Sequence, residues 1–423
     1  MRRFISVLLV MLLLSSCAVD KETDGEIVVN NSENNYIYLA NEKFATDQYL
    51  EEYDIQRQFQ TLTTGLCETE NAFYSLTDDF IIYIDKQSGY SGVLCGKPEC
   101  THGTIDCNGQ VYVAAGLTVY DHQLYWVGWE KVEFGQVSHL YLWRMDLDGT
   151  NREKVKQMDE ELNSMLNGDR FVQIHRGYVY MAGGTSIVNK GIPSESTIVY
   201  AESMNSDEEP IIIINKEHFN EPSPHHRIQL IGNQLYIMIS TSNGDGTCGL
   251  ELYKWDSATR ELTTLFEDKT MPFYGWEMWV EEEDGIYITS FSIAVIGMDV
   301  PAGVYKYDFA TQEISQCFEM KEDDVFYIVA DIADQIALIC TRGGHEKDNL
   351  FVKDFEGNIL YNGALDIPEL EDDVLYTKYF YGGNKENIYY LFKNNSTDIK
   401  QKYLIQIPLT EKVDPVILWK EEK

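Results

Sequence analysis

The sequence predicts an all-β protein that forms a single β-propeller after an export signal and a flexible spacer. Seven four-stranded blades fit best, and six or eight remain open. Apolar residues come in short runs without helical spacing, and aromatic residues make up 13% of the chain, with 28 tyrosines. Both features favour β-strands. The same pattern recurs about every fifty residues, and such a period is typical of propeller blades.

The N-terminus has the layout of an export signal. Arg2 and Arg3 precede an apolar run, and Leu14-Ser15-Ser16-Cys17 then leads into an abruptly polar stretch. The apolar run is far shorter than the ~20 residues that a bilayer span requires. This stretch resembles the lipobox of bacterial lipoproteins. The resemblance implies a signal peptide over residues 1–16, acyl chains on Cys17, and anchoring at the outer side of the bacterial cytoplasmic membrane, at the cell surface.

Residues 17–55 are predicted to be a lipidated acidic spacer. The stretch is rich in Asp, Glu and Asn and has only isolated apolar residues. Such a composition buries too little apolar surface to fold by itself. We therefore expect a flexible, partly disordered tether that can lend a strand to the propeller, which takes up residues 56–423.

Each repeat has an anchor of apolar and aromatic residues on an inner strand. The seven anchors are spaced by 50 to 56 residues: Phe73-Tyr74, Leu124-Tyr125-Trp126, Val179-Tyr180, Leu235-Tyr236, Ile286-Tyr287, Ile336-Ala337 and Ile388-Tyr389-Tyr390. A second run follows most anchors and ends in an Asp-containing turn, as at Asp85, Asp256 and Asp308. Asp favours such turns because its side chain bonds to its own backbone. A last apolar strand completes the four strands.

One repeat suggests a family. Leu124-Tyr125-Trp126, followed by Tyr141 to Arg152, resembles a blade of the YWTD propellers of low-density-lipoprotein receptors and of TolB-like propellers on bacterial lipoproteins. The resemblance covers most of residues 60–421 as a pattern. The family's Thr-Asp after the Tyr-Trp pair is Val127-Gly128 here, and the period is longer. The resemblance implies the propeller fold and leaves the function open.

The predicted loops concentrate on one face of the propeller. Antiparallel strands place each connection between the second and third strands on the same face as the crossing to the next blade. These connections are long in six units: Trp129 to Val137, Gly183 to Ser196, Thr241 to Gly249, Ser290 to Gly303, Arg342 to Asn349 and Lys393 to Lys402. Loops on a rigid scaffold commonly carry binding residues, so we expect the ligand on this face.

The first unit instead has a long crossing that holds Cys95, Cys100, His102 and Cys107. Three interpretations stay open. Export favours a disulfide that staples the loop, whereas three thiolates and an imidazole could hold a structural zinc ion. The third is a free reactive thiol, because pairing two of three cysteines leaves one over. Cys67, at the start of the same unit, could be a fourth partner. No other cofactor is indicated.

Further candidates for ligand binding are aromatic, histidine and arginine side chains in the loops and crossings. They are Trp129, His218, His225, His226, Arg227, Phe273, Tyr274, Trp276 and Trp279. Aromatic platforms with a few polar groups suit sugar or peptide ligands. The competing interpretation is packing between blades, since periodic apolar positions are most often core.

The formal net charge of −36 disfavours nucleic acid as a partner because phosphates would be repelled. No catalytic residues are predicted, because the sequence has no G-x-S-x-G, H-E-x-x-H or P-loop pattern. The favoured function is therefore binding of an extracellular protein, peptide or glycan by a membrane-anchored monomer. The alternative is a hydrolase or lyase that acts on extracellular polysaccharide with carboxylates in the central channel.

Overall fold

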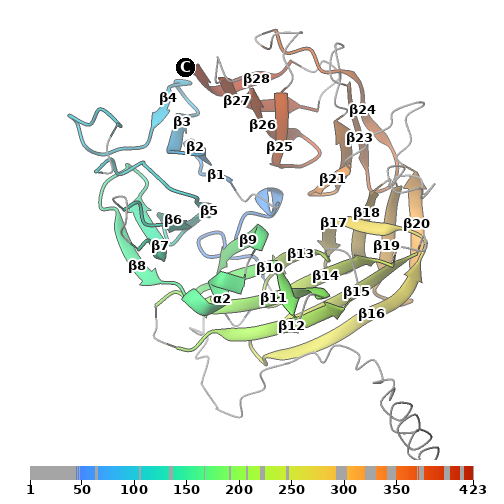
Figure 1. Cartoon of the computed structure of the whole chain (residues 1–423). Coiled ribbons are helices and arrows are strands. Elements are labelled where there is room, and N and C mark those ends of the chain that lie inside the picture. Colours follow the sequence, from blue (N-terminus) through green and yellow to red (C-terminus); the bar gives the residue numbers. More distant parts are fainter. Residues whose placement is uncertain are drawn as a thin grey trace, which may run out of the picture.

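In the computed structural model, seven four-stranded antiparallel sheets form a ring, as a seven-bladed β-propeller does (Figure 1). The predicted fold class and blade number are confirmed. The structure describes residues 44, 46, 48–61, 65–103, 106–132, 137–165, 167–189, 192–205, 208–219, 224–243, 247–291, 303–319, 330–340, 349–368, 370, 376–394, 401–409 and 414–422. Cys17 lies outside these residues.

Each blade is built from consecutive strands, so no described blade borrows a strand from the other end of the chain. The first three blades are β1 (Leu66–Glu68), β2 (Ala72–Leu76), β3 (Ile81–Asp85) and β4 (Ser91–Val93); β5 (Ala115–Tyr120), β6 (Gln123–Trp129), β7 (Leu140–Asp146) and β8 (Glu153–Gln157); and β9 (Asn167–His175), β10 (Tyr178–Asn189), β11 (Ile192–Ser203) and β12 (Ile211–Phe219).

The fourth and fifth blades are β13 (His225–Ile231), β14 (Gln234–Ser242), β15 (Cys248–Asp256) and β16 (Glu261–Met271); and β17 (Tyr274–Glu281), β18 (Gly285–Phe291), β19 (Gly303–Asp308) and β20 (Ile314–Glu319). The last two are β21 (Ala330–Ala333), β22 (Ile336–Cys340), β23 (Asn349–Asp354) and β24 (Ile359–Ala364); and β25 (Tyr376–Gly383), β26 (Asn387–Asn394), β27 (Gln401–Pro408) and β28 (Val416–Glu422). The helices are η2 (Arg57–Phe59) and α2 (Glu160–Met165).

The repeat elements read from the sequence are placed as follows. All seven anchors lie on the second strand of a blade, next to the innermost strand. The Asp turns form as expected: Asp256 accepts backbone N–H groups of Ala258 and Thr259 at 2.8 and 2.9 Å. One predicted loop is wrong. Residues 183–196 are mostly the extended hairpin of β10 and β11, because the two strands stay paired from Tyr178 to Asn189.

The apolar core is distributed around the ring. The buried apolar side chains of the described residues form seven clusters, and each cluster joins two neighbouring blades. The cluster between the last and first blades includes Phe73 and Tyr389. Lys393 and Lys402 add ion pairs across the same seam to Asp78, at 2.6 and 3.0 Å. The ring is thus closed by side chains rather than by a shared sheet.

The N-terminal segment, residues 44, 46 and 48–61, lies inside the ring (blue in Figure 1). Its contacts to the blades begin at Phe44, so part of the predicted spacer packs against the propeller. The segment reaches the end of the first strand, or the turn after it, in all seven blades: Glu68, Asp121, Arg176, Leu230, Val280, Asp334 and Gly382. We call this side of the ring the plain face and the opposite side the loop-bearing face.

Arg176 holds the N-terminal segment most firmly. Its guanidinium group forms two hydrogen bonds to the carboxylate of Asp54, at 2.6 and 2.8 Å, and both side chains are buried. It also donates to the carbonyl oxygens of Phe44 and Gln48, at 3.1 and 2.7 Å. A buried charge is tolerated only when it is paired in this way. The segment is therefore held at the plain end of the ring centre.

No helix in the described part of the chain has the length and hydropathy needed to cross a membrane.

Candidate functional site

Three neighbouring innermost strands bring charged side chains together at the ring centre. They are Arg227 on β13, Glu277 on β17 and Asp331 on β21; Tyr390, on β26, completes the group, which we call the central cluster. Arg227 donates two hydrogen bonds to the Glu277 carboxylate, from Nε at 2.7 Å and from Nη2 at 2.5 Å. The Tyr390 hydroxyl donates to Asp331 Oδ2 at 3.4 Å. The cluster thus joins a neutral ion pair to a second carboxyl group.

The central cluster lies above the N-terminal segment. The backbone carbonyls of Leu230 and Val280 accept hydrogen bonds from Gln60 and Arg57 of that segment, and Arg57 also pairs with Asp334. Each cluster residue on β13, β17 and β21 precedes one of these contact residues by three positions. At about 3.3 Å per strand residue, the cluster lies about 10 Å towards the loop-bearing face.

Asp331 is the most perturbed acid of the cluster. Burial raises the pKa of its carboxyl group to about 8, and the negative charge of Glu277 adds to this; the Tyr390 hydroxyl and Arg227 act in the opposite direction. The residue as a whole is half-buried. Asp331 is therefore largely protonated at neutral pH.

The surroundings of the central cluster are aromatic and amide-rich. His225 stacks on Trp276 at 4.2 Å, and Arg227 lies 4.9 Å from the ring centroid of Phe171. Gln173 and Gln229 are both 1% exposed. Three of their amide atoms have no hydrogen-bond partner among the described residues: Nε2 and Oε1 of Gln173, and Nε2 of Gln229. Buried polar atoms without partners are uncommon in native proteins.

The predicted ligand-binding residues divide into two groups. Arg227 belongs to the central cluster, and His225, Tyr274 and Trp276 come together beside it. The others pack within or between blades: Phe273 stacks on Tyr305 at 3.8 Å, Trp279 is 1% exposed, His218 is buried beside Thr197, His226 packs against Phe171, and Trp129 packs half-buried at the end of β6.

Sequence reasoning missed Glu277, Asp331 and Tyr390. A signal was present, because Arg227, Glu277 and Asp331 are spaced by about one repeat period. Each is a charged residue within a strand that otherwise consists mainly of apolar or aromatic residues. Charged residues at equivalent positions of successive innermost strands lie side by side once the ring closes.

The cysteine loop forms a second candidate site. One ligand atom each of Cys95, Cys100, His102 and Cys107 lies within 4.8 Å of the other three, and His102 Nδ1 is 3.4 Å from Cys107 Sγ. Zinc bound tetrahedrally by sulfur at about 2.3 Å places ligand atoms about 3.7 Å apart. The four side chains could therefore hold a metal ion after small movements.

Hydrogen bonds in the cysteine loop favour the thiolate of Cys95, whereas burial disfavours that of Cys107. Burial opposes ionisation of Cys95, but the backbone N–H groups of Lys97 and Asn108 and two neighbouring thiols lower its pKa overall. Burial raises the pKa of the Cys107 thiol to about 12, against a backbone N–H donated by Gly109. Metals bind the thiolate form. A bound cation would offset the cost of ionising both sulfurs.

The cysteine loop also fastens the first blade to the second. The Gly149 carbonyl accepts hydrogen bonds from the Gly96 backbone at 2.9 Å and from the Asn108 amide at 2.8 Å. Arg152 donates to the carbonyl oxygens of Cys107 and Gln110. Cys67 does not join the group. It is buried in β1 within the apolar cluster of the first two blades, and it is a free thiol.

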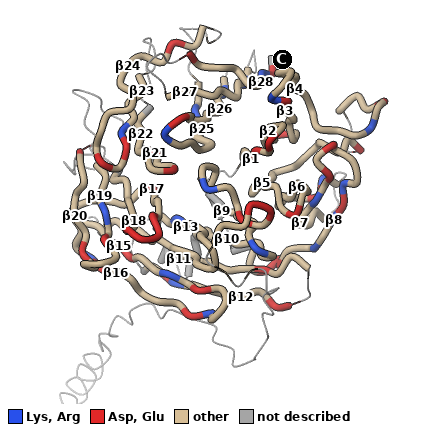
Figure 2. Tube along the Cα trace, turned by 180° about the vertical axis from the view of Figure 1, so that it is seen from behind, with Lys and Arg blue, Asp and Glu red and all other residues tan. Residues whose placement is uncertain are grey.

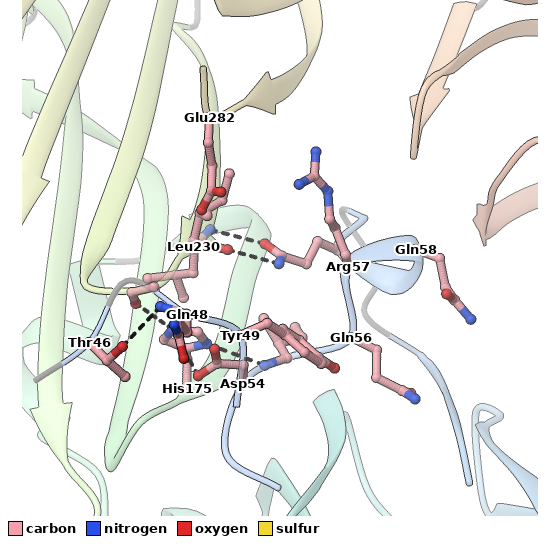
Figure 3. Close-up of a pocket in the computed structure, with 14 residues that line it drawn as sticks. Thr46, Gln48, Tyr49, Asp54, Gln56, Arg57, Gln58, His175, Leu230 and Glu282 are labelled. Atoms are coloured by element: carbon pink, nitrogen blue, oxygen red, sulfur yellow. Dashed lines mark hydrogen bonds and ion pairs between the residues drawn. The ribbon is translucent and has the colours of Figure 1, made fainter. Parts of the chain in front are cut away.

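A pocket of about 790 Å³ lies on the plain face between the N-terminal segment and the third to fifth blades (Figure 3). The polar groups of His175 and Gln60 in its lining are already paired. His175 Nδ1 accepts the N–H of Ile55 at 3.2 Å, and its Nε2 contacts the Gly232 carbonyl at 2.8 Å. Gln60 exchanges two hydrogen bonds with the backbone of Leu230. These groups support the packing of the segment and leave little for a ligand.

Acidic positions occur all around the ring rather than on one side (Figure 2). The formal charge of −36 is therefore spread over many blades. A long-range field of this kind attracts cations from any direction.

Comparison with protein-family models finds no match, and comparison with curated proteins finds none either. Solved structures do match. A prolyl endopeptidase shares 12% identity with a TM-score of 0.52, over 91% of this chain and 52% of its own. The xyloglucanase from Xanthomonas campestris shares 11% identity at 0.47, over 86% and 55%. An oligogalacturonate lyase in complex with manganese shares 12% at 0.44, over 85% and 91%.

The chain spans about half the length of the first two structures. At such low identities the likeness shows the fold alone. The resemblance to YWTD and TolB-like propellers stays a prediction, and the function must be argued from the chain's own residues. The chain is a seven-bladed β-propeller with structural neighbours among propeller peptidases.

Proposed function

We propose that this protein is an exported, lipid-anchored binding protein whose ligand, a protein segment, peptide or glycan, enters the ring centre from the loop-bearing face. The observation that carries the proposal is the central cluster, in which Glu277 and Asp331 are half-buried and lie about 10 Å from the N-terminal segment towards the loop-bearing face. A ligand that enters from the loop-bearing face meets the cluster beside an aromatic wall. Ligand sites commonly combine apolar walls with a few polar groups in this way.

Binding is favoured over catalysis because Glu277 is already engaged. Both oxygens of its carboxylate accept hydrogen bonds from Arg227, so the carboxylate is occupied and is not aimed at a substrate proton. The alternative is a polysaccharide hydrolase or lyase with Asp331 as the acid and Glu277 as its partner. A pair of carboxyl groups is the usual acid and base of such enzymes.

The binding function is tested with full-length protein on arrays of glycans and peptides. Glu277→Gln should weaken the captured ligand by about 10-fold or more, because it breaks a buried charge pair at the site. Glu283→Gln, on the exposed turn after β17, is the matched control and should leave affinity unchanged. Cleavage of an arrayed glycan by wild type but not by Glu277→Gln would favour the enzyme instead.

We also propose that Cys95, Cys100, His102 and Cys107 bind a structural zinc ion. Four side chains converge, whereas a disulfide would need only two. Three Cys and one His fill a tetrahedral shell, so no position remains for catalysis. Metal analysis should find one zinc ion per chain, lost in Cys107→Ser and kept in Cys317→Ser. Cys317 is exposed and outside the group. A disulfide within the loop and no zinc would contradict the proposal.

The proposed lipid anchor and the proposed location at the outer side of the cytoplasmic membrane both rest on Cys17. Mass spectrometry of the N-terminal peptide should find Cys17 as the acylated first residue of the processed protein. Cys17→Ser should release the protein from the outer side of the cytoplasmic membrane. An unmodified Cys17 would contradict both. The protein is proposed to be a monomer that does not bind nucleic acid. Size-exclusion chromatography with and without DNA tests both proposals.

A further inference from the structure

We propose that the central cluster binds a ligand ammonium group, that of a lysine side chain on a peptide, through the carboxylate of Asp331. The inference rests on the proposed binding function and narrows its ligand class. It assigns Asp331 as the residue that recognises the charge, beside the ion pair of Glu277 and Arg227.

The charges of the cluster can be balanced by one more cation. Arg227 uses Nε and Nη2 on Glu277 and donates from Nη1 to the His226 carbonyl at 2.9 Å. Arg227 makes no hydrogen bond to Asp331 in the described part of the chain. There the carboxyl group of Asp331 is hydrogen-bonded only to Tyr390. With both carboxyl groups ionised, the cluster has one negative charge more than it has positive charges. An ammonium group would balance it and form charge-assisted hydrogen bonds.

A metal ion or an anion fits the cluster less well. Among the described residues, the cysteine loop is where three or more metal-ligating side chains converge. The central cluster has only two carboxyl groups, and one of them is occupied by Arg227. An anionic ligand would be repelled by Glu277 and by the overall charge of −36. An organic cation remains as the complementary class.

The unpartnered glutamines favour a peptide over a free amine. Gln229 lies two residues after Arg227 on β13, and Gln173 lies two residues after Phe171, which Arg227 covers. Side chains two residues apart point to the same side of a strand. Nε2 of Gln229 and both amide atoms of Gln173 lack partners, so they can bond to a peptide backbone, which a simple amine does not offer. Binding would then satisfy polar atoms that the described structure leaves without partners.

Binding of an ammonium group is coupled to the release of a proton from Asp331. Glu277 on β17, Arg227 on β13 and Tyr390 on β26 are the charged and titratable groups that act on Asp331. Its pKa of about 8 means that Asp331 carries a proton at neutral pH. The ammonium group binds the carboxylate form, so the carboxyl O–H bond breaks and the proton passes to the buffer. No other bond changes.

Isothermal titration of full-length protein tests the inference with a matched peptide pair, acetyl-Ala-Lys-Ala-amide and acetyl-Ala-norleucine-Ala-amide. The lysine peptide should bind more tightly by about 10- to 100-fold, the range for a hydrogen bond to a charged group. Asp331→Asn should remove this difference. Asp79→Asn, on an exposed turn, is the control and should keep it.

A second measurement uses wild type alone. Lysine-peptide affinity should rise by about 10-fold per pH unit below the pKa of Asp331, and titrations in phosphate and Tris should show proton release. Equal affinity for both peptides, or no binding of either, overturns the inference. If a glycan binds in a way that depends on Glu277 and not on Asp331, the inference fails while the proposed function stands. If Glu277→Gln leaves the affinity for every ligand unchanged, both the inference and the proposed function fail.

Discussion

Asp331→Asn should make the protein more stable at neutral pH and remove much of the pH dependence of its stability. Asn has nearly the shape of a protonated Asp and no proton to lose. In the folded protein, Asp331 is held at a pKa of about 8, first by burial and then by Glu277, against the ordinary value of 3.8. This shift is a cost to folding that wild type carries at neutral pH.

The sign and size follow from the two pKa values. Below pH 3.8, Asp331 is protonated in both the folded and the unfolded chain, and its contribution to the free energy of unfolding is fully present. Between pH 4 and 8 only the folded chain holds it, so the free energy of unfolding falls by about 1.4 kcal/mol per pH unit. The loss at pH 7 is at most about 4 kcal/mol. Because Asp331 keeps some solvent contact, a gain of about 2 kcal/mol is expected for Asn.

Urea unfolding from pH 4 to pH 9 measures this difference. The wild-type midpoint should fall as the pH rises, while the Asp331→Asn midpoint changes much less. The two curves should meet near pH 4. Parallel curves over the whole range would refute the reasoning, because Asp331 would then titrate alike in the folded and unfolded chains.

Three further predictions concern the frame around the site. Asp54→Asn leaves the buried guanidinium of Arg176 without its carboxylate and should lower the free energy of unfolding by about 3–5 kcal/mol; an unchanged urea midpoint would show that the N-terminal segment does not hold the ring. A chelator should lower the thermal midpoint of wild type but not of Cys107→Ser, and an equal drop in both would argue against zinc in the cysteine loop. The backbone N–H of Thr311 and then the ammonium group of Lys306 lower the pKa of Asp308 to about 2. Its stabilising contribution is present above pH 3.8 and lost as the pH falls to 2, so Asp308→Asn should flatten the acid limb of the stability curve.

Features that depend on neighbouring residues were predictable from the sequence. The blade number follows from the anchors, and turns at Asp256 and Asp308 form because each carboxylate bonds to N–H groups two or three residues later. The cysteine loop was recognisable for the same reason, since its four residues lie within one crossing. The export signal is equally local, and Cys17 remains a prediction.

The tertiary structure decided what lies at the ring centre. Arg227, Glu277 and Asp331 belong to different blades, and only closure of the ring places their strands side by side. The N-terminal segment has a polar composition that predicts a tether, yet Asp54 finds a buried arginine more than a hundred residues away. Periodicity within one strand determines which face of a blade is buried. It carries no record of partners in other blades, because those contacts exist only once the ring has formed.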